Sequence, residues 1–351
     1  EFRRVLFRSV ILLDVDLAAA ERGKAGIAKR LGDSVAKGRL AADKAEQTLA
    51  RITPTADYGA LRGAQLVVEA VFEDRTAKAR VIESSDAVLG ADAVLATNTS
   101  TLPITGLAEY AKRAKNFIGL HFFSPVDRMP LVEVIRGKRT ADATLARALD
   151  FVQRLRKTPI VVNDSRGFFT SRFFGSYVNE GISMVAEGVN PALIENVARM
   201  LGMPVGPLAV QDEVGLDLAV SVTRQTRADL GEQWQPGTSY PIVEKLSAGL
   251  GRHGRKSGGG FYEYPAGGKK HLWAGLADIW PHSVDQPDPG DVRRRLLYVQ
   301  LIEALKCMQE GVLEDPADGD VGAVFGVGFP AYTGGPFSYI DHLGAEQVLR
   351  E

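Results

Sequence analysis

Short apolar runs that alternate with helical stretches dominate the first half of this chain and restrict its possible folds more than any other feature. The runs that predict strands lie at residues 10–14, 66–70, 93–97, 117–122, 131–135 and 159–162. Helical patterns occupy about 74–89 and 142–156, and a long segment rich in Ala, Lys and Arg follows residue 14. Buried strands that alternate with helices are typical of a largely parallel sheet with both faces covered. We therefore expect an α/β fold over residues 10–163.

The pattern changes after Asn163. Residues 166–187 and 191–201 are predicted helices, and no later run resembles a strand as strongly. A glycine-rich stretch at 251–260 precedes a Pro, Gly and polar segment at 265–290, which we interpret as a linker. Residues 291–310 are again helical in pattern. The expected order is an α/β domain at 10–163, a helical domain at 164–264, the linker, and a second helical domain at 291–351.

The two helical regions share two short motifs in the same order. Ala-Glu-Gly-Val at 186–189 is echoed by Gln-Glu-Gly-Val at 309–312. Gly-Pro at 206–207, followed by Asp and Gly at 212 and 215, is echoed at 335–336, 341 and 344. Chance similarity is the alternative explanation. Two motifs in one order favour a duplicated helical domain whose copies pack face to face.

Charge and cysteine content exclude several classes of protein. A formal net charge of −1 gives no polyelectrolyte attraction to nucleic acid or to an anionic membrane. No apolar run approaches the roughly 18–20 residues that span a bilayer, and no secretory signal is visible. The single cysteine, Cys307, excludes an intramolecular disulfide and lies in a helical pattern, so we interpret it as an inert thiol. We expect no metal site.

The first nine residues fit no predicted element. Three arginines alternate there with apolar side chains and lead into no recognisable pattern. We interpret residues 1–9 as a junction or artefact and exclude them from the fold. A remnant of a mitochondrial targeting segment is the alternative.

A polar cluster, Asn98-Thr99-Ser100-Thr101, directly follows the predicted strand at 93–97. Ligands of open α/β sheets bind beyond the carboxyl ends of the strands, so these side chains are well placed to bind a cofactor or substrate. A helix N-cap for the next short segment explains the same residues equally well.

His121 and Glu133 make a second candidate pair. His121 ends one predicted strand, Glu133 lies in the next, and a hairpin centred on Asp127 places the two opposite each other. Directly opposed residues of an antiparallel pair have Cβ atoms about 4.5–5.5 Å apart, close enough for an imidazole–carboxylate hydrogen bond. Such a carboxylate fixes the histidine tautomer and raises the basicity of the other ring nitrogen. The pair therefore predicts a general base, although a lone histidine is more often structural.

Asp14 closes the first predicted strand, and a helix follows it. An acidic residue at the end of the second strand of a dinucleotide-binding fold accepts hydrogen bonds from the adenosine ribose. The Gly-x-Gly-x-x-Gly turn that should precede it by about 20 residues is not in the sequence, so we expect the first strand and glycine-rich loop of such a fold to be missing. Asp16 is a competing candidate, but it is better explained as a helix cap.

Several longer motifs of this chain resemble 3-hydroxyacyl-CoA dehydrogenases, most closely the dehydrogenase part of the multifunctional fatty-acid β-oxidation enzymes. The resemblance runs from about residue 10 to the C-terminus. The motifs, in order, are 67–73 (VVEAVFE), 98–101 (NTST), 119–125 (GLHFFSP), 129–135 (MPLVEVI), 157–164 (KTPIVVND), 255–262 (RKSGGGFY), and 326–336 (GVGFPAYTGGP).

The resemblance implies a partial Rossmann-like domain followed by a duplicated all-helical dehydrogenase domain, with NAD as cofactor. His121 would be the general base, Glu133 would orient it, and Ser100 would hydrogen-bond the reacting oxygen. The residues implied at the NAD site are Asp14, Val71, Glu73, Lys78, Asn98, Ser100, Ser124 and Lys256. Without the resemblance, Glu73 and Lys78 would be interpreted as a solvated pair at a helix start.

Two departures from the family pattern concern the site. Ser171 stands where many relatives carry an Asn that helps to hold the substrate carbonyl, so Ser100 and Ser171 are the implied substrate ligands. Ser124 also stands where Asn is frequent. The missing strand and glycine loop would remove backbone N–H groups that cradle the cofactor pyrophosphate.

The leading hypothesis is NAD-dependent oxidation of L-3-hydroxyacyl-CoA within a larger multifunctional enzyme that also has an upstream hydratase/isomerase domain. The implied partners are an acyl-CoA thioester and either further copies of the chain or a thiolase subunit. The implied location is the bacterial cytoplasm, with mitochondrion or peroxisome as alternatives. Two other functions compete: a non-catalytic acyl-CoA-binding or scaffold relative, and a dehydrogenase of small 3-hydroxy acids. Relatives of the second kind use a catalytic Lys, which the His–Glu pair disfavours.

Overall fold

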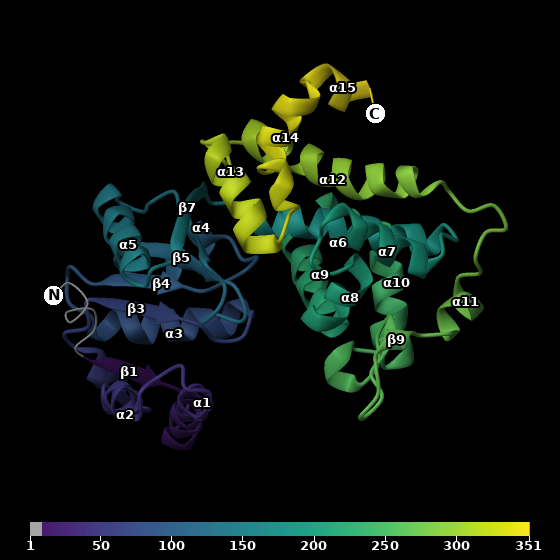
Figure 1. The fold of residues 1–351 in the computed structure, drawn as a ribbon. Coiled ribbons are helices and arrows are strands. Elements are labelled where there is room, and N and C mark those ends of the chain that lie inside the picture. Colours follow the sequence, from purple (N-terminus) through teal and green to yellow (C-terminus); the bar gives the residue numbers. More distant parts are fainter. Residues whose placement is uncertain (1–8, 351) are drawn as a thin grey trace. The chain divides into compact units, whose positions relative to one another are not determined.

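The computed structural model describes residues 9–350, which form two compact units (Figure 1). The first unit contains the chain up to Asn98 together with Thr105–Ile118 and Arg139–Arg156. The second contains Thr99–Ile104, Gly119–Lys138 and the chain from Lys157 onward. The interpretation of residues 1–9 as a junction falls, except for Ser9, outside the described residues.

The first unit contains two pairs of parallel strands. β1 (Val10–Leu13) pairs with β2 (Ile52–Thr55), and β3 (Leu66–Glu69) pairs with β4 (Val94–Thr97). Its longer helices are α1 (Leu17–Ala36), α2 (Ala42–Ala50), α3 (Arg75–Val88) and α5 (Asp142–Arg154), and it contains all but the first residue of the short α4 (Ile104–Leu107). Asp16 caps α1 by accepting the N–H of Ala19, as the sequence predicted, and Asp74 caps α3 in the same way through Ala77.

β2 was not predicted from the sequence. Its four residues, Ile-Thr-Pro-Thr, include a proline and only one aliphatic side chain, so they lack the apolar run that marks a buried strand. β1 and β2 form a two-stranded sheet of their own, whereas the sequence suggested one continuous sheet.

β3 and β4 belong to a five-stranded sheet, in the order β3-β4-β5-β6-β7, with three further strands. β5 (Phe117–Phe122) begins in the first unit and ends in the second, which also contains β6 (Leu131–Arg136) and β7 (Thr158–Asn163). β6 pairs with β7 in parallel and with β5 in antiparallel orientation. The predicted antiparallel hairpin is therefore confirmed. β5 and β6 are buried along almost their whole length, so their side chains form much of the core here.

The rest of the second unit is mainly helical. Its longest helices, α6 (Thr170–Ala186) and α12 (Pro289–Gln309), pack against each other. The others are α7 (Pro191–Leu201), α8 (Pro207–Val214), α9 (Leu216–Leu230), α10 (Tyr240–Glu244), α11 (Gly275–Ile279), α13 (Pro316–Gly322), α14 (Pro336–Leu343) and α15 (Ala345–Arg350). None of the helices within residues 9–350 is both long and apolar enough to cross a bilayer.

The segment at 265–290, which we interpreted as a linker, is attached to the helices that precede it. It contains α11 and β9 (His271–Leu272), which pairs with β8 (Tyr262–Glu263). Further along, the side chain of Gln286 donates to the carbonyl of Gly188 and accepts the N–H of Asn190. These bonds fix the segment to the end of α6 and the start of α7.

Candidate active site

His121 on β5 and Glu133 on β6 face each other directly in the antiparallel pair. Nδ1 of His121 lies 2.9 Å from Oε2 of Glu133. The Glu133 side chain is fully buried, whereas 11% of the His121 side chain remains exposed. The observed register pairs His121 with Glu133, as the predicted hairpin required, so the prediction that these two residues face each other is confirmed.

Glu133 is held by three donors besides the histidine. Its Oε1 accepts the backbone N–H groups of Phe169 and Thr170, each at 3.0 Å, and its Oε2 accepts the hydroxyl of Thr170 at 2.5 Å. These groups belong to the first residues of α6, where free N–H groups and the helix dipole favour a carboxylate. The carboxylate therefore cannot turn away from His121 without losing several hydrogen bonds.

The backbone before α6 has an unusual conformation that brings those N–H groups to Glu133. Gly167 and Phe168 both have positive φ, 76° and 49°, and a non-glycine residue rarely adopts this region. Phe168 is nevertheless fully buried, and its ring centroid lies 6.4 Å from that of His121. The left-handed pair of residues thus places an aromatic ring beside the imidazole and points the start of α6 at the carboxylate.

The second ring nitrogen of His121 is the atom that chemistry could use. Nδ1 is engaged by Glu133, and within residues 9–350 no group hydrogen-bonds Nε2. When Nδ1–H donates to the carboxylate, the neutral ring carries its lone pair on Nε2. Phe123 lies against the imidazole with ring centroids 4.4 Å apart. The arrangement can accept a proton at Nε2 and stabilise the resulting imidazolium through Glu133.

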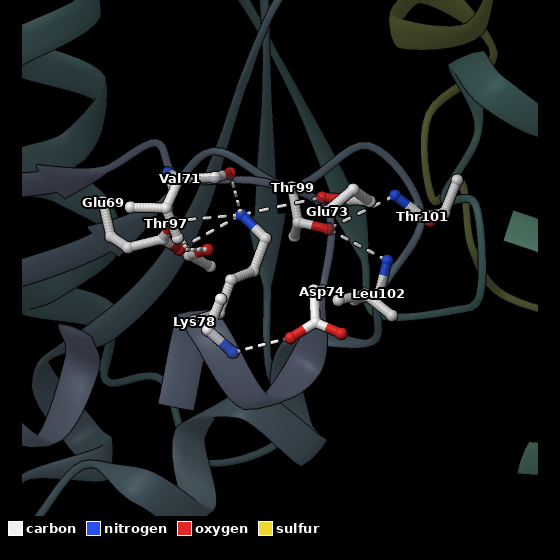
Figure 2. A network of polar contacts seen from close by, with 10 residues as sticks. Glu69, Val71, Glu73, Asp74, Lys78, Thr97, Thr99, Thr101 and Leu102 are labelled. Atoms are coloured by element: carbon white, nitrogen blue, oxygen red, sulfur yellow. Dashed lines mark hydrogen bonds and ion pairs between the residues drawn. The ribbon is translucent and has the colours of Figure 1, made fainter. Parts of the chain in front are cut away.

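Ser100 and Ser171 are also brought together in the second unit. The hydroxyl of Ser171 donates to the backbone carbonyl of Ser100 at 2.9 Å, and the N–H of Gly167 donates to the carbonyl of Thr101. Thr99 accepts the N–H of Leu102 at 3.0 Å through its hydroxyl (Figure 2). Thr99 therefore forms a side-chain turn and not the helix N-cap that the sequence offered as an alternative, because the next helix begins at Ile104, whose N–H is accepted by Asp164. Ser100, next to Thr99, is half-buried.

The other predicted cofactor ligands of the first unit lie at or just beyond the carboxyl ends of its strands. Asp14 is exposed after β1 and accepts the N–H of Val15. Val71 and Glu73 lie in the loop between β3 and α3, and Asn98 follows β4. The N–H of Asn98 donates to the carbonyl of Glu69 at 2.7 Å.

Lys78 corrects the interpretation of a solvated charge pair at a helix start. Its side chain is fully buried, and its Nζ lies 3.0 Å from Oε1 of Glu69, 3.3 Å from the carbonyl of Val71, and 3.6 Å from Oε2 of Glu73 (Figure 2). The sequence could not show this because a lysine three residues into a polar helix usually faces water.

Ser124 and Lys256 are not joined to His121 by a direct contact. Ser124 is exposed in the turn that follows β5. Lys256 lies in the glycine-rich segment of the helical region, where its Nζ is 2.5 Å from Oδ2 of Asp217. This ion pair is exposed on both sides.

The sequence did not reveal Thr170, Glu69 or Thr97 as site residues. Thr170 stands directly before Ser171, which was singled out, but its contact partner Glu133 lies 37 positions earlier in the chain. Glu69 and Thr97 end two neighbouring strands, and that position was the available signal.

A largely parallel sheet that is followed by helices, with a buried His–Glu pair on it, defines a Rossmann-type dehydrogenase. The chain belongs to the 3-hydroxyacyl-CoA dehydrogenase family. The NAD-binding domain of that family matches residues 8–165, and its C-terminal domain matches residues 167–264. The family that the motifs suggested is therefore confirmed.

Curated relatives and solved structures agree with this assignment. The alpha subunit of the fatty acid oxidation complex of Shewanella loihica is 38% identical over 325 residues, which are 92% of this chain and 45% of that protein. The chain thus spans about half the length of such relatives. The 3-hydroxybutyryl-CoA dehydrogenase of Escherichia coli has a TM-score of 0.81 at 26% identity, covering 97% of this chain and 88% of that one. The dehydrogenase part of multifunctional enzyme 1 from C. elegans has a TM-score of 0.59 at 26% identity, covering 88% and 71%.

Proposed function

We propose that the protein oxidises a 3-hydroxyacyl-CoA thioester to the 3-oxoacyl-CoA thioester, with NAD as the hydride acceptor. The observation that carries this proposal is the His121–Glu133 pair, whose outer ring nitrogen remains available while the inner one is fixed. Fatty-acid oxidation is the proposed setting, because the curated relatives are subunits of fatty acid oxidation complexes.

The proposed proton transfer uses groups of the second unit. Nε2 of His121 takes the proton of the substrate 3-hydroxyl while the hydrogen on C3 leaves as hydride. The imidazolium that forms is stabilised by Glu133, which Thr170 and the start of α6 hold in place. Ser100 is proposed to hydrogen-bond the reacting oxygen, and Ser171, which donates to the carbonyl of Ser100, to bind the substrate.

The residues present suit a nicotinamide dinucleotide. Bound NAD supplies a two-electron acceptor at its nicotinamide ring. Asp14 is an exposed carboxylate at a strand end, the position that accepts ribose hydroxyls in such folds. We assign Val71, Glu73, Lys78, Asn98, Ser100, Ser124 and Lys256 to cofactor contact. We assign no residue to the pyrophosphate.

We also propose that the helical region is an internal duplication. Arg172 on α6 binds Glu303 on α12 and Glu310 directly after its end, and Arg295 on α12 binds Glu180 on α6 and Glu187 directly after its end. The same interval along the chain separates 172 from 295, 180 from 303, and 187 from 310. Reciprocal contacts of this kind are the signature of two equivalent surfaces related by a two-fold axis. They support duplication over a chance similarity of the motifs.

Caps at equivalent positions support the same proposal. In one copy Glu195 accepts the N–H of Leu208 near the start of α8, and in the other Asp320 accepts the N–H of Phe337 near the start of α14. We accordingly propose helical domains at 164–264 and 291–351. We also propose a bacterial cytoplasmic location and assembly with a thiolase subunit or with further copies of the chain. Assembly is supported by the curated relatives, which are subunits of fatty acid oxidation complexes.

The test is reduction of acetoacetyl-CoA by the full-length protein, followed as the loss of NADH absorbance at 340 nm. We expect turnover of the CoA thioester and little turnover of free acetoacetate. Turnover of the free acid at a comparable rate would instead indicate a dehydrogenase of small 3-hydroxy acids. Binding of acetoacetyl-CoA without any turnover would indicate a non-catalytic relative.

A further inference from the structure

Glu69, at the end of β3, joins three segments of the first unit through one buried carboxylate. Its Oε2 accepts the hydroxyl of Thr97 at 2.5 Å, and its Oε1 accepts both Lys78 Nζ at 3.0 Å and the N–H of Val71 at 2.7 Å (Figure 2). The carboxylate therefore connects the end of β4, the first turns of α3, and the loop between β3 and α3.

Lys78 directs its ammonium at the same loop. Besides Glu69, its Nζ contacts the carbonyl of Val71 and the carboxylate of Glu73. The side chains of Lys78 and Glu69 are both fully buried. A buried ion pair contributes little net stability, since an apolar pair of similar volume does as well or better. We therefore look for the role of the Glu69–Lys78 pair in the loop conformation that it fixes.

The loop that this network holds carries residues assigned to the cofactor. Both main-chain polar groups of Val71 are engaged by the ion pair, its N–H by Glu69 and its carbonyl by Lys78. The side chains of this loop nevertheless reach the surface, because Val71 is 37% exposed and Phe72 is 89% exposed. The backbone of this loop is held by buried groups, and its side chains are exposed. Such a loop is suited to bind a ligand beyond the carboxyl end of β3.

We propose that Glu69 and Thr97 are positioning residues for NAD, which hold the loop at 70–74 through Val71 and Lys78 without touching the cofactor. The proposal rests on the proposed function. It separates these two residues from Glu73, Lys78 and Asn98, which are assigned to the cofactor itself.

The test compares Thr97→Val with Thr97→Ser in the full-length protein. Valine keeps the size of threonine but removes the donor to Glu69, whereas serine retains the hydroxyl. We expect Thr97→Val to raise the Kd for NADH and the KM for NAD about ten-fold, because the buried carboxylate loses one of its donors. The KM for the acyl-CoA substrate should change less than about two-fold, and Thr97→Ser should behave like the unaltered protein.

Glu69→Gln is the second variant, and it should show the same selective loss of cofactor affinity. Equal changes of the NAD and acyl-CoA constants would indicate a general structural role and overturn the proposal. Native NADH affinity in both Thr97→Val and Glu69→Gln would also overturn it. Should Thr97→Val fail to fold, Thr97→Ala, which also lacks the hydroxyl, repeats the test. If the unaltered protein neither binds NADH nor turns over, the proposed function fails, whereas an active protein with unaffected variants refutes only this inference.

Discussion

Two buried glutamates, one in each unit, have nearly the same surroundings, and we propose different roles for them. Glu133 accepts a threonine hydroxyl, backbone N–H groups and Nδ1 of His121, while Glu69 accepts a threonine hydroxyl, a backbone N–H and Nζ of Lys78. The difference lies in the partner. His121 keeps a second nitrogen that no group within residues 9–350 binds. The ammonium of Lys78, in contrast, contacts Glu69, Val71 and Glu73. We propose that this second nitrogen is what allows the Glu133 pair, and not the Glu69 pair, to take part in proton transfer.

The comparison predicts its largest effect at His121. We expect His121→Ala to lower kcat for acyl-CoA oxidation about 10³–10⁴-fold, because general-base catalysis is lost and the buried Glu133 keeps only its α6 donors. The Kd for NADH should stay within about two-fold, since the cofactor ligands assigned in the first unit are unchanged. Stopped-flow turnover and NADH fluorescence titration measure the two quantities. Turnover close to that of the unaltered protein would remove His121 from the mechanism.

The next effect concerns stability rather than rate. Lys78→Met leaves the buried Glu69 charge without its cation, so we expect the free energy of unfolding to fall by about 3–5 kcal/mol. The double variant Lys78→Met/Glu69→Gln removes both charges and should recover most of that loss. Urea denaturation of the two variants provides the measurement. A double variant no more stable than Lys78→Met would show that the pair is needed for more than charge balance.

Glu133→Gln addresses the other carboxylate and should act mainly on rate. The amide can still accept from α6, but it no longer stabilises an imidazolium, so we expect kcat to fall about 10²-fold. Stopped-flow turnover at saturating NAD measures this loss. Glu69→Gln is the matched control, for which we expect kcat at saturating NAD to fall far less, because its amide lies in the first unit and does not contact His121. A comparable loss of kcat in both variants would erase the distinction between the two glutamates.

The sequence predicted the His121–Glu133 pair because hairpin register is a local property. The two residues lie 12 positions apart, and the alternation of side chains along two strands fixes which residues are opposed. Thr170 lies 37 positions from Glu133, and only the path of the chain between β7 and α6 brings it there. Its role in holding the carboxylate could not be inferred from any spacing.

Two other features show why local patterns were insufficient elsewhere. β2 forms because β1 offers it a parallel partner, and its Pro54 and two threonines give no apolar signal of their own. Lys78 is buried because Glu69, nine positions away on a strand, neutralises it, and a charged residue on a helix start otherwise predicts exposure. At both places, contacts with other segments of the chain produced the opposite of what the local sequence predicted.

Asp212 on α8 offers a third buried carboxylate, and one whose donors are all neutral. It accepts the N–H groups of Phe261 and Tyr262 at 2.8 and 2.9 Å and the hydroxyl of Tyr264 at 3.1 Å. Burial raises the pKa of Asp212 to about 6, a cost that these hydrogen bonds and the more distant charge of Arg252 only partly offset. No side chain larger than hydrogen fits at Gly260, since a Cβ there would lie 2.0 Å from Oδ1 of Asp212.

The last and smallest predicted effect follows from that raised pKa. Between the pKa of the unfolded carboxyl, near 3.9, and the folded value of about 6, the native state binds more protons than the unfolded state. The contribution of Asp212 to stability is therefore present at low pH and is lost as the pH rises through about 6. Asp212→Asn does not titrate, so the unaltered protein should lose about 2 kcal/mol relative to this variant between about pH 4.5 and about pH 6.5. Urea denaturation at both pH values measures the difference. If the stability difference between the two proteins does not change with pH, neutral donors alone are enough to keep a buried carboxylate charged. The positively charged Lys78 beside Glu69 and the imidazole of His121 beside Glu133 would then need an explanation other than charge balance.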